Sequence, residues 1–174
     1  MHLFNTTHLK VYPPERNCGE GSGIQACKVE FQFKGPPGAN DGRDIALIRL
    51  SSPMNIQGNI ELPFETPVDD QRTIMAGTGR NNVNTCKSLL SYQTVQNSFL
   101  APQWYETKGT YRAVSGSCRG DSGGPDWSFG VGLTGITSGA PLDDIGCTTG
   151  LTVFSNIAFY QEWIEETMEN FASC

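Results

Sequence analysis

The sequence predicts an all-β fold with one α-helix at the C-terminus. Its apolar segments are short, and turn-forming residues interrupt them often, a pattern typical of a β-sandwich or barrel. The 20 glycines and 10 prolines among 174 residues suit a loop-rich β protein, as does a charged fraction of only 17%. Helical spacing of apolar residues occurs at the C-terminus, over residues 157–171.

The predicted strands follow one another between glycine and proline turns. Val29–Phe33 reads Val-Glu-Phe-Gln-Phe, and this alternation indicates a half-buried strand. Further strands are expected at 45–48, from residue 73 into a glycine turn at 77–79, at 131–136 and at 151–154, with a loop at 35–42 and a linker at 63–70.

The predicted C-terminal helix is amphipathic. Ile157, Tyr160, Ile164, Met168 and Phe171 recur at intervals of three and four, so they share one face. Most of the glutamates in this segment fall elsewhere around the helix. We therefore expect its apolar face to pack on the β body, in a purely structural role.

Charge and composition exclude several function classes. The net charge is −6 and no block of Lys or Arg occurs, which disfavours nucleic-acid binding. No apolar run is long enough to span a bilayer, so no membrane association is predicted. The six cysteines are scattered, without the short paired spacings of zinc sites, and therefore predict disulfides and a secreted, extracellular protein.

The first residues add two expectations. Asn5-Thr6-Thr7 is a glycosylation acceptor sequence, which agrees with secretion but also arises often by chance. The start of the chain does not resemble an export signal. We therefore expect either that export is arranged upstream or that the chain is a fragment or truncated gene product.

Residues 118–125 read Cys-Arg-Gly-Asp-Ser-Gly-Gly-Pro and form the strongest motif. A serine hydroxyl is a poor nucleophile until a neighbouring base removes its proton. The oxyanion of acyl transfer needs preorganised N–H donors, which the main chain of Gly120 and Ser122 can supply. Adjacent glycines let the backbone turn and let a substrate approach closely.

The run Gly-Asp-Ser-Gly-Gly-Pro, residues 120–125, is similar to the segment around the catalytic serine of the chymotrypsin/trypsin family. Other segments resemble this family in the same order. They are Asp44–Leu50, which resembles the aspartate segment; 76–80, the glycine turn of the second barrel; 135–138, the strand that holds substrate; and 154–157 with 163–164, the last strand and helix.

This resemblance implies a fold of two antiparallel β-barrels, the first incomplete, followed by the C-terminal helix. It implies one peptidase domain over 1–174, N-terminally truncated. Residues 1–66 would be a remnant of the first barrel, and 67–174 the second barrel plus the helix. The active site of the family lies between the two barrels.

The resemblance also implies a Ser–His–Asp triad. Ser122 is the nucleophile and Asp44 the carboxylate that orients the base, whereas Asp41, in a glycine-rich loop, is expected to be solvated. His2 is favoured as the base because its distance along the chain from Asp44 is closer to the family interval. The alternatives are that His2 is a terminal histidine without a role, or that His8 is the base.

Asp121 matches the family aspartate that pairs with an N-terminus freed by proteolysis. This chain contains no matching activation segment. We therefore expect Asp121 to lack its partner, and the oxyanion loop to lose its shape, because an unpaired buried charge is costly.

The family pattern also implies a substrate pocket. Gly116 falls at its base, Ser138 and Ala140 on its edge strand, and Thr152 on its opposite wall. No charge is present at the base, so a small or medium uncharged side chain is the expected preference.

The resemblance further implies a disulfide between Cys118 and Cys147 beside the pocket. The other four cysteines, 18, 27, 86 and 174, allow three pairings. Cys18 with Cys27 would close a short glycine-rich loop, and Cys86 can instead have lost a partner upstream. A metal site is disfavoured because no ligands cluster.

Taken together, these features predict a secreted serine endopeptidase that forms an acyl-enzyme on Ser122 and needs no cofactor. The predicted partners are protein or peptide substrates and protein protease inhibitors, with no nucleic acid and no membrane. A catalytically inactive homologue or truncated product that only binds partners is the first alternative. A disulfide-rich structural domain is the second.

Overall fold

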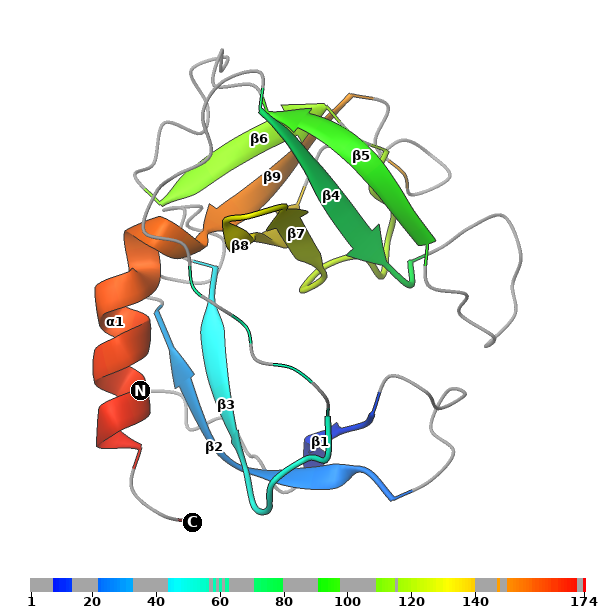
Figure 1. The fold of residues 1–174 in the computed structure, drawn as a ribbon. Helices are drawn as coiled ribbons and strands as arrows, with labels where there is room; N and C mark the ends of the chain where they lie inside the picture. Colours follow the sequence, from blue (N-terminus) through cyan, green and yellow to red (C-terminus); the bar gives the residue numbers. More distant parts are fainter. Residues whose placement is uncertain are drawn as a thin grey trace, which may run out of the picture.

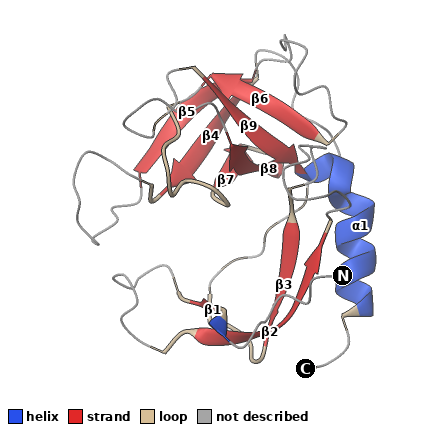
Figure 2. Ribbon diagram, turned by 180° about the vertical axis from the view of Figure 1, so that it is seen from behind, coloured by secondary structure: helices blue, strands red, loops and turns tan. Residues whose placement is uncertain are grey.

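The computed structural model describes residues 8–13, 22–32, 44–56, 58, 60, 62, 71–79, 109–114, 116–139, 147, 150–171 and 174, together with the backbone of 91–97. These residues form an open sheet, a closed barrel and one helix (Figure 1). The two β units lie one above the other, as the view from behind also shows (Figure 2).

The first unit is a three-stranded antiparallel sheet of β1 (Lys10–Val11), β2 (Ile24–Phe31) and β3 (Ala46–Leu50), in that order. Val29 of β2 lies opposite Ile48 of β3, and a register shift occurs between Ala26 and Lys28. The predicted strand at 29–33 overlaps β2 only at residues 29–31, because β2 begins earlier, at Ile24, and ends at Phe31.

The second unit is a closed barrel, so all its strands have partners on both sides. Its core contains Met75, Tyr111, Ala113 and Phe154, and the rings of Tyr111 and Phe154 stack with centroids 5.3 Å apart. The strands are β4 (Arg72–Gly77), β5 (Ser91–Asn97), β6 (Thr110–Val114), β7 (Pro125–Ser128), β8 (Gly132–Gly139) and β9 (Leu151–Asn156), and the barrel order is β4-β5-β6-β9-β8-β7.

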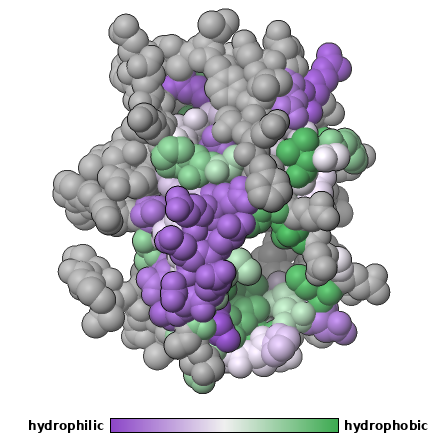
Figure 3. All heavy atoms as spheres, turned by 60° about the vertical axis from the view of Figure 1, so that its left-hand side comes forward, coloured by the Kyte–Doolittle hydropathy of each residue, from purple (hydrophilic) through white to green (hydrophobic). Residues whose placement is uncertain are grey.

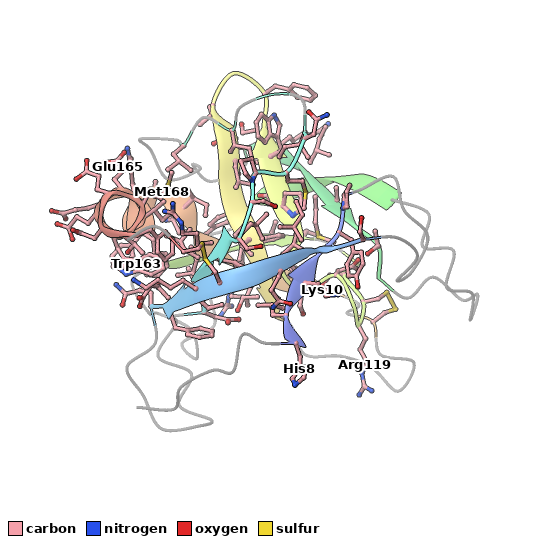
Figure 4. The ribbon with its side chains drawn as sticks, turned by 90° about the horizontal axis from the view of Figure 1, so that it is seen from below. His8, Lys10, Arg119, Trp163, Glu165 and Met168 are labelled. Carbon is pink, nitrogen blue, oxygen red and sulfur yellow. A yellow bond between two sulfur atoms is a disulfide. The ribbon has the colours of Figure 1, made fainter. Side chains whose placement is uncertain are left out.

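Helix α1 (Ile157–Asn170) starts directly after β9 and confirms the predicted helix, ending one residue earlier than expected. Ile157, Tyr160 and Ile164 are buried, but Met168 is 59% exposed, so its predicted place on the packed face was wrong. The outer face is hydrophilic (Figure 3), and Glu165 points outward on it (Figure 4). No helix in the described ranges is long and apolar enough to cross a membrane.

The buried face of α1 joins the two β units. Ile157, Tyr160 and Ile164 pack against side chains of both. The partners are Ile45, Leu47 and Leu62 from the part of the chain that holds the sheet, Leu133 and Ile136 from β8, and Trp163 of the helix itself. Burial of this shared apolar surface favours one arrangement of sheet and barrel.

The end of the chain is fixed to the first sheet. Cys174 forms a disulfide with Cys27 of β2. The Arg49 Nη1 of β3 donates to the main-chain oxygen of Phe171 over 2.9 Å, and the Lys28 ammonium lies 5.3 Å from the Phe171 ring centroid. The suggested bridge between Cys18 and Cys27 was therefore wrong. Cys18 and Cys86 lie outside the described residues.

Replacing Cys27 and Cys174 by serine removes a link between residues 147 positions apart. Because this link constrains a long stretch of the unfolded chain, we expect a loss of about 3–5 kcal/mol in the free energy of unfolding. Denaturant titration measures this loss. The control, C118S/C147S, frees a span of only 29 positions and should lose less. An unchanged stability of C27S/C174S would refute the stabilising role.

Candidate active site

Ser122 lies in a tight turn that leads into β7. Gly120 and Gly123 on either side have φ of 97° and 83°, a left-handed conformation that glycine adopts without steric cost. The Gly123 N–H donates to the Thr137 oxygen of β8 over 2.8 Å, and the Thr137 N–H donates to the Gly124 oxygen over 2.8 Å. These bonds fix the turn against β8 and leave the Ser122 side chain exposed.

The two amides expected to bind an oxyanion are uncommitted. Among the described residues, the N–H groups of Gly120 and Ser122 donate to no other group, whereas the neighbouring N–H of Asp121 donates to the Cys118 oxygen over 3.1 Å. Uncommitted, preorganised donors are what a developing oxyanion requires.

Asp121 does not lack partners, and the contrary expectation was wrong. Its Oδ1 accepts from the Gly79 N–H at 2.7 Å and its Oδ2 from the Cys118 N–H at 2.8 Å. The side chain is almost fully buried, with 9% exposure. Hydrogen bonds from amides to an ionised acceptor are strong, so both carboxylate oxygens are stabilised within the chain itself.

The glycine turn after β4 is shaped around this carboxylate. A Cβ atom added at Gly77 or Gly79 would overlap the Asp121 carboxyl group. A side chain at either position would force the carboxyl group to move. The sequence identified this turn, but nothing in it showed which side chain the turn encloses.

Asp44 links the first sheet to the barrel. Its Oδ2 accepts from the Ser138 hydroxyl of β8 at 2.7 Å, and its main-chain oxygen accepts from the Ser155 hydroxyl of β9 at 2.6 Å. Since Thr137 binds the turn of Ser122, consecutive residues of β8 hold the serine segment and the carboxylate. Ser138 was expected only to hold substrate, and no sequence signal pointed to Ser155.

The histidines are placed less completely. His2 and Asp41 lie outside the described residues. His8, just before β1, is exposed and points away from the ribbon (Figure 4). Within the described part of the chain, no hydrogen bond joins His8 to Asp44 or Ser122. The assignment of His2 as the base stays a prediction.

Cys118 and Cys147 form a disulfide, the pairing that the resemblance implied. Gly116 is exposed. The hydroxyls of Ser117 and Thr152 are 2.6 Å apart, and both residues are buried. Sequence reasoning missed Ser117, and Ala140 lies outside the described residues.

Over the ranges that the structure covers, no three His, Cys, Asp or Glu residues gather where they could hold a metal ion.

A methyl group at Gly79 tests the role of the turn. Gly79→Ala places its Cβ against the Asp121 carboxyl group, and we expect a loss of about 1–3 kcal/mol in stability. We also expect a serine-directed phosphonate to label Ser122 at least about tenfold more slowly, a barrier increase of some 1.4 kcal/mol. Gly150→Ala is the control, because its Cβ meets no atom within 4 Å. Equal labelling rates in both variants would contradict this role.

Comparison with known proteins identifies the family. The family model described as Trypsin matches residues 2–164. The chain is 30% identical to mouse kallikrein 1-related peptidase b16 over 148 residues, which cover 76% of this chain and 56% of the relative. It is 28% identical to chymotrypsin-like elastase family member 1 of Macaca fascicularis over 151 residues, 73% of this chain and 55% of the relative.

Solved structures agree with this result. The structure of mouse neuropsin, a serine protease expressed in the limbic system of the brain, superimposes with a TM-score of 0.69 at 27% identity. The match covers 84% of this chain and 72% of neuropsin. The chain spans little more than half the length of the curated relatives it matches. With the family model matching most of its length, the chain belongs to the trypsin family of serine proteases.

Proposed function

We propose that this chain is a serine endopeptidase that cleaves peptide bonds through an acyl-enzyme on Ser122. The observation that carries the proposal is the state of the serine turn. The turn is bonded to β8 through Gly123 and Gly124, and the amides of Gly120 and Ser122 remain uncommitted in the described structure. These two N–H groups are therefore available to a substrate oxyanion.

In the proposed mechanism, the Ser122 hydroxyl attacks the scissile carbonyl carbon while His2 accepts its proton. The amides of Gly120 and Ser122 stabilise the resulting oxyanion. His2 then returns the proton to the leaving amine, and water hydrolyses the acyl-enzyme by the same route. No cofactor takes part.

Asp44 acts as the carboxylate that orients His2. Its hydrogen bond with Ser138 supports this role, because a second donor fixes one carboxylate oxygen and limits the directions in which the other can accept. A base held in one tautomer and orientation is what efficient proton transfer requires.

The proposed substrate preference is a small, uncharged side chain. Gly116 brings no charge to the pocket base, and the hydroxyls of Ser117 and Thr152 bond to each other. Breaking the hydrogen bond between these two buried hydroxyl groups would cost free energy. The pair is therefore expected to stay together and to leave too little room in the pocket for a larger substrate side chain. Ser138 and Ala140 would hold the substrate main chain from the edge strand.

The proposed setting is extracellular, with protein or peptide substrates and protein inhibitors as partners. Two disulfides in the described residues, Cys27–Cys174 and Cys118–Cys147, support an oxidising compartment.

Phosphonate labelling tests the proposed chemistry. The folded protein should be labelled at Ser122, as peptide mass mapping reads out, and Ser122→Ala should take no label. Asp44→Asn should keep the fold but lose about 10⁴-fold in peptidase rate, because the base loses its correct tautomer. A correctly folded protein that takes no label would instead support a binding homologue.

Two variants of Thr152 test the pocket. Thr152→Gly removes the side chain that closes the space beside Ser117, so cleavage after Leu or Phe should rise relative to Ala by about 10–200-fold. Thr152→Val keeps the volume and loses only the hydroxyl, so it should retain the small-residue preference. Competing peptides that differ only at the residue before the cleaved bond give the ratio. An unchanged ratio in Thr152→Gly would place Thr152 outside the pocket.

A further inference from the structure

Asp126 is a buried acid that the proposed mechanism does not use. It lies in β7, just beyond the Gly-Asp-Ser-Gly-Gly-Pro segment, and its exposed fraction is 0%. Nothing in the sequence pattern singled it out. Since a buried ionised carboxylate without a cation costs several kcal/mol, its protonation state needs an explanation.

Three strands direct hydroxyl groups at Asp126. Its Oδ2 accepts from the Tyr111 hydroxyl of β6 at 2.5 Å and from the Thr73 hydroxyl of β4 at 2.9 Å. The Thr134 hydroxyl of β8 donates to the main-chain oxygen of Asp126 at 3.0 Å and lies 3.5 Å from Oδ2. The side chain therefore ties β4, β6 and β7 together inside the barrel.

The other carboxyl oxygen is unpartnered. Within the described structure, Asp126 Oδ1 is buried and has no hydrogen-bond partner. An ionised carboxylate shares its charge between both oxygens, so about half of that charge would sit at Oδ1 without a donor. In the neutral acid, Oδ2 is the carbonyl oxygen that accepts from Tyr111 and Thr73, and Oδ1 carries the proton. An unpartnered neutral O–H group at Oδ1 costs far less than an unpartnered share of a negative charge.

The surrounding charges do not compensate an ionised Asp126. Arg72 of β4 and Arg112 of β6 are adjacent to Thr73 and Tyr111, so they point to the opposite face of their strands. The described parts of β7, β8 and β9 carry no other ionisable side chain. Tyr111 is thus the titratable group that faces the acid in the part of the barrel the structure describes.

Burial sets the direction of both shifts. It raises the pKa of Asp126 above its ordinary value, and the hydrogen bonds from Tyr111, Thr73 and Thr134 offset this only in part. Burial also raises the pKa of Tyr111, which therefore stays a neutral donor.

We propose that Asp126 is a neutral carboxylic acid in the folded protein and acts as a pH-sensitive lock on the second barrel. Ionisation puts a charge between β4, β6 and β8 that no cation in the described part of the barrel balances. β7, which carries Asp126, begins at Pro125, immediately after the Gly123 and Gly124 contacts with β8. Loosening β7 when Asp126 ionises therefore also loosens the turn that holds Ser122.

The pH dependence has a definite sign. An acid whose folded-state pKa is raised contributes its full stability below its unfolded value of about 3.8. As the pH rises toward the folded pKa, the unfolded chain releases the proton first, so stability falls. The folding equilibrium constant should drop by a factor of about ten for each unit of pH in this window.

Asp126→Asn tests the lock, because the amide matches the neutral acid in shape and cannot ionise. Equilibrium unfolding is measured for both proteins from pH 4 to pH 8. We expect the stability of Asp126→Asn relative to the parent to increase with pH, about tenfold per unit until the folded acid ionises. The control Glu169→Gln makes the same change of charge on the exposed face of α1, so a pH dependence that appears only in Asp126→Asn belongs to the buried acid.

A pH-independent difference for Asp126→Asn, or one that shrinks as pH rises, overturns the proposal. Infrared spectroscopy of the parent protein gives a second test that needs no stable variant. A carbonyl band of a protonated carboxyl group at neutral pH supports the lock, and its absence overturns it. Neither measurement depends on activity at Ser122.

Discussion

The hydrogen bond between the Ser138 hydroxyl and the Asp44 carboxylate is the contact on which the arrangement of the site depends. Asp44 precedes the last strand of the open sheet, and Ser138 belongs to the closed barrel. Because the preceding residue of β8, Thr137, is bonded to the serine turn, β8 fixes the position of the Asp44 carboxylate relative to Ser122. The apolar contacts of α1 with both units stabilise their arrangement through the hydrophobic effect, and so keep Asp44 and Ser138 within hydrogen-bond distance.

The serine turn itself is shaped by electrostatics within the chain. Asp121 receives amide hydrogen bonds on both oxygens, and the glycines of the turn after β4 leave room for it. The Asp121 carboxylate thereby links the serine turn to the turn after β4. The same barrel contains Asp126, whose environment favours the neutral acid. The two buried acids differ in their donors: Asp121 accepts from amides on both oxygens, whereas Asp126 accepts from hydroxyl groups on Oδ2 alone.

Much of the architecture could be predicted from the sequence, and the exceptions have physical causes. The helix, the strands rich in β-branched residues and the turn around Ser122 have strong local patterns. Strands β5, β6 and β7 were not predicted, because Ser-Tyr-Gln-Thr-Val-Gln-Asn and Pro-Asp-Trp-Ser read as polar or turn-like. Their pairing in the barrel overrides that local preference. The contacts of Asp44 with Ser138 and of Asp121 with Gly79 join residues far apart in the chain, so no local pattern reveals them. The partner of Cys27 was equally undetermined, since three pairings were compatible with the sequence.

The bridge from Cys27 of β2 to Cys174 closes a covalent ring that contains β3, the barrel strands and α1, whereas β1 and the first residues of β2 lie outside it. Proteases can cleave other protease molecules, and such cuts fall mainly in exposed loops. A single cut between residues 27 and 174 would leave both pieces attached, whichever loop it struck. Under oxidising conditions a cleaved molecule would therefore migrate as a single species of nearly unchanged mass, and only reduction of the disulfide would separate the two pieces.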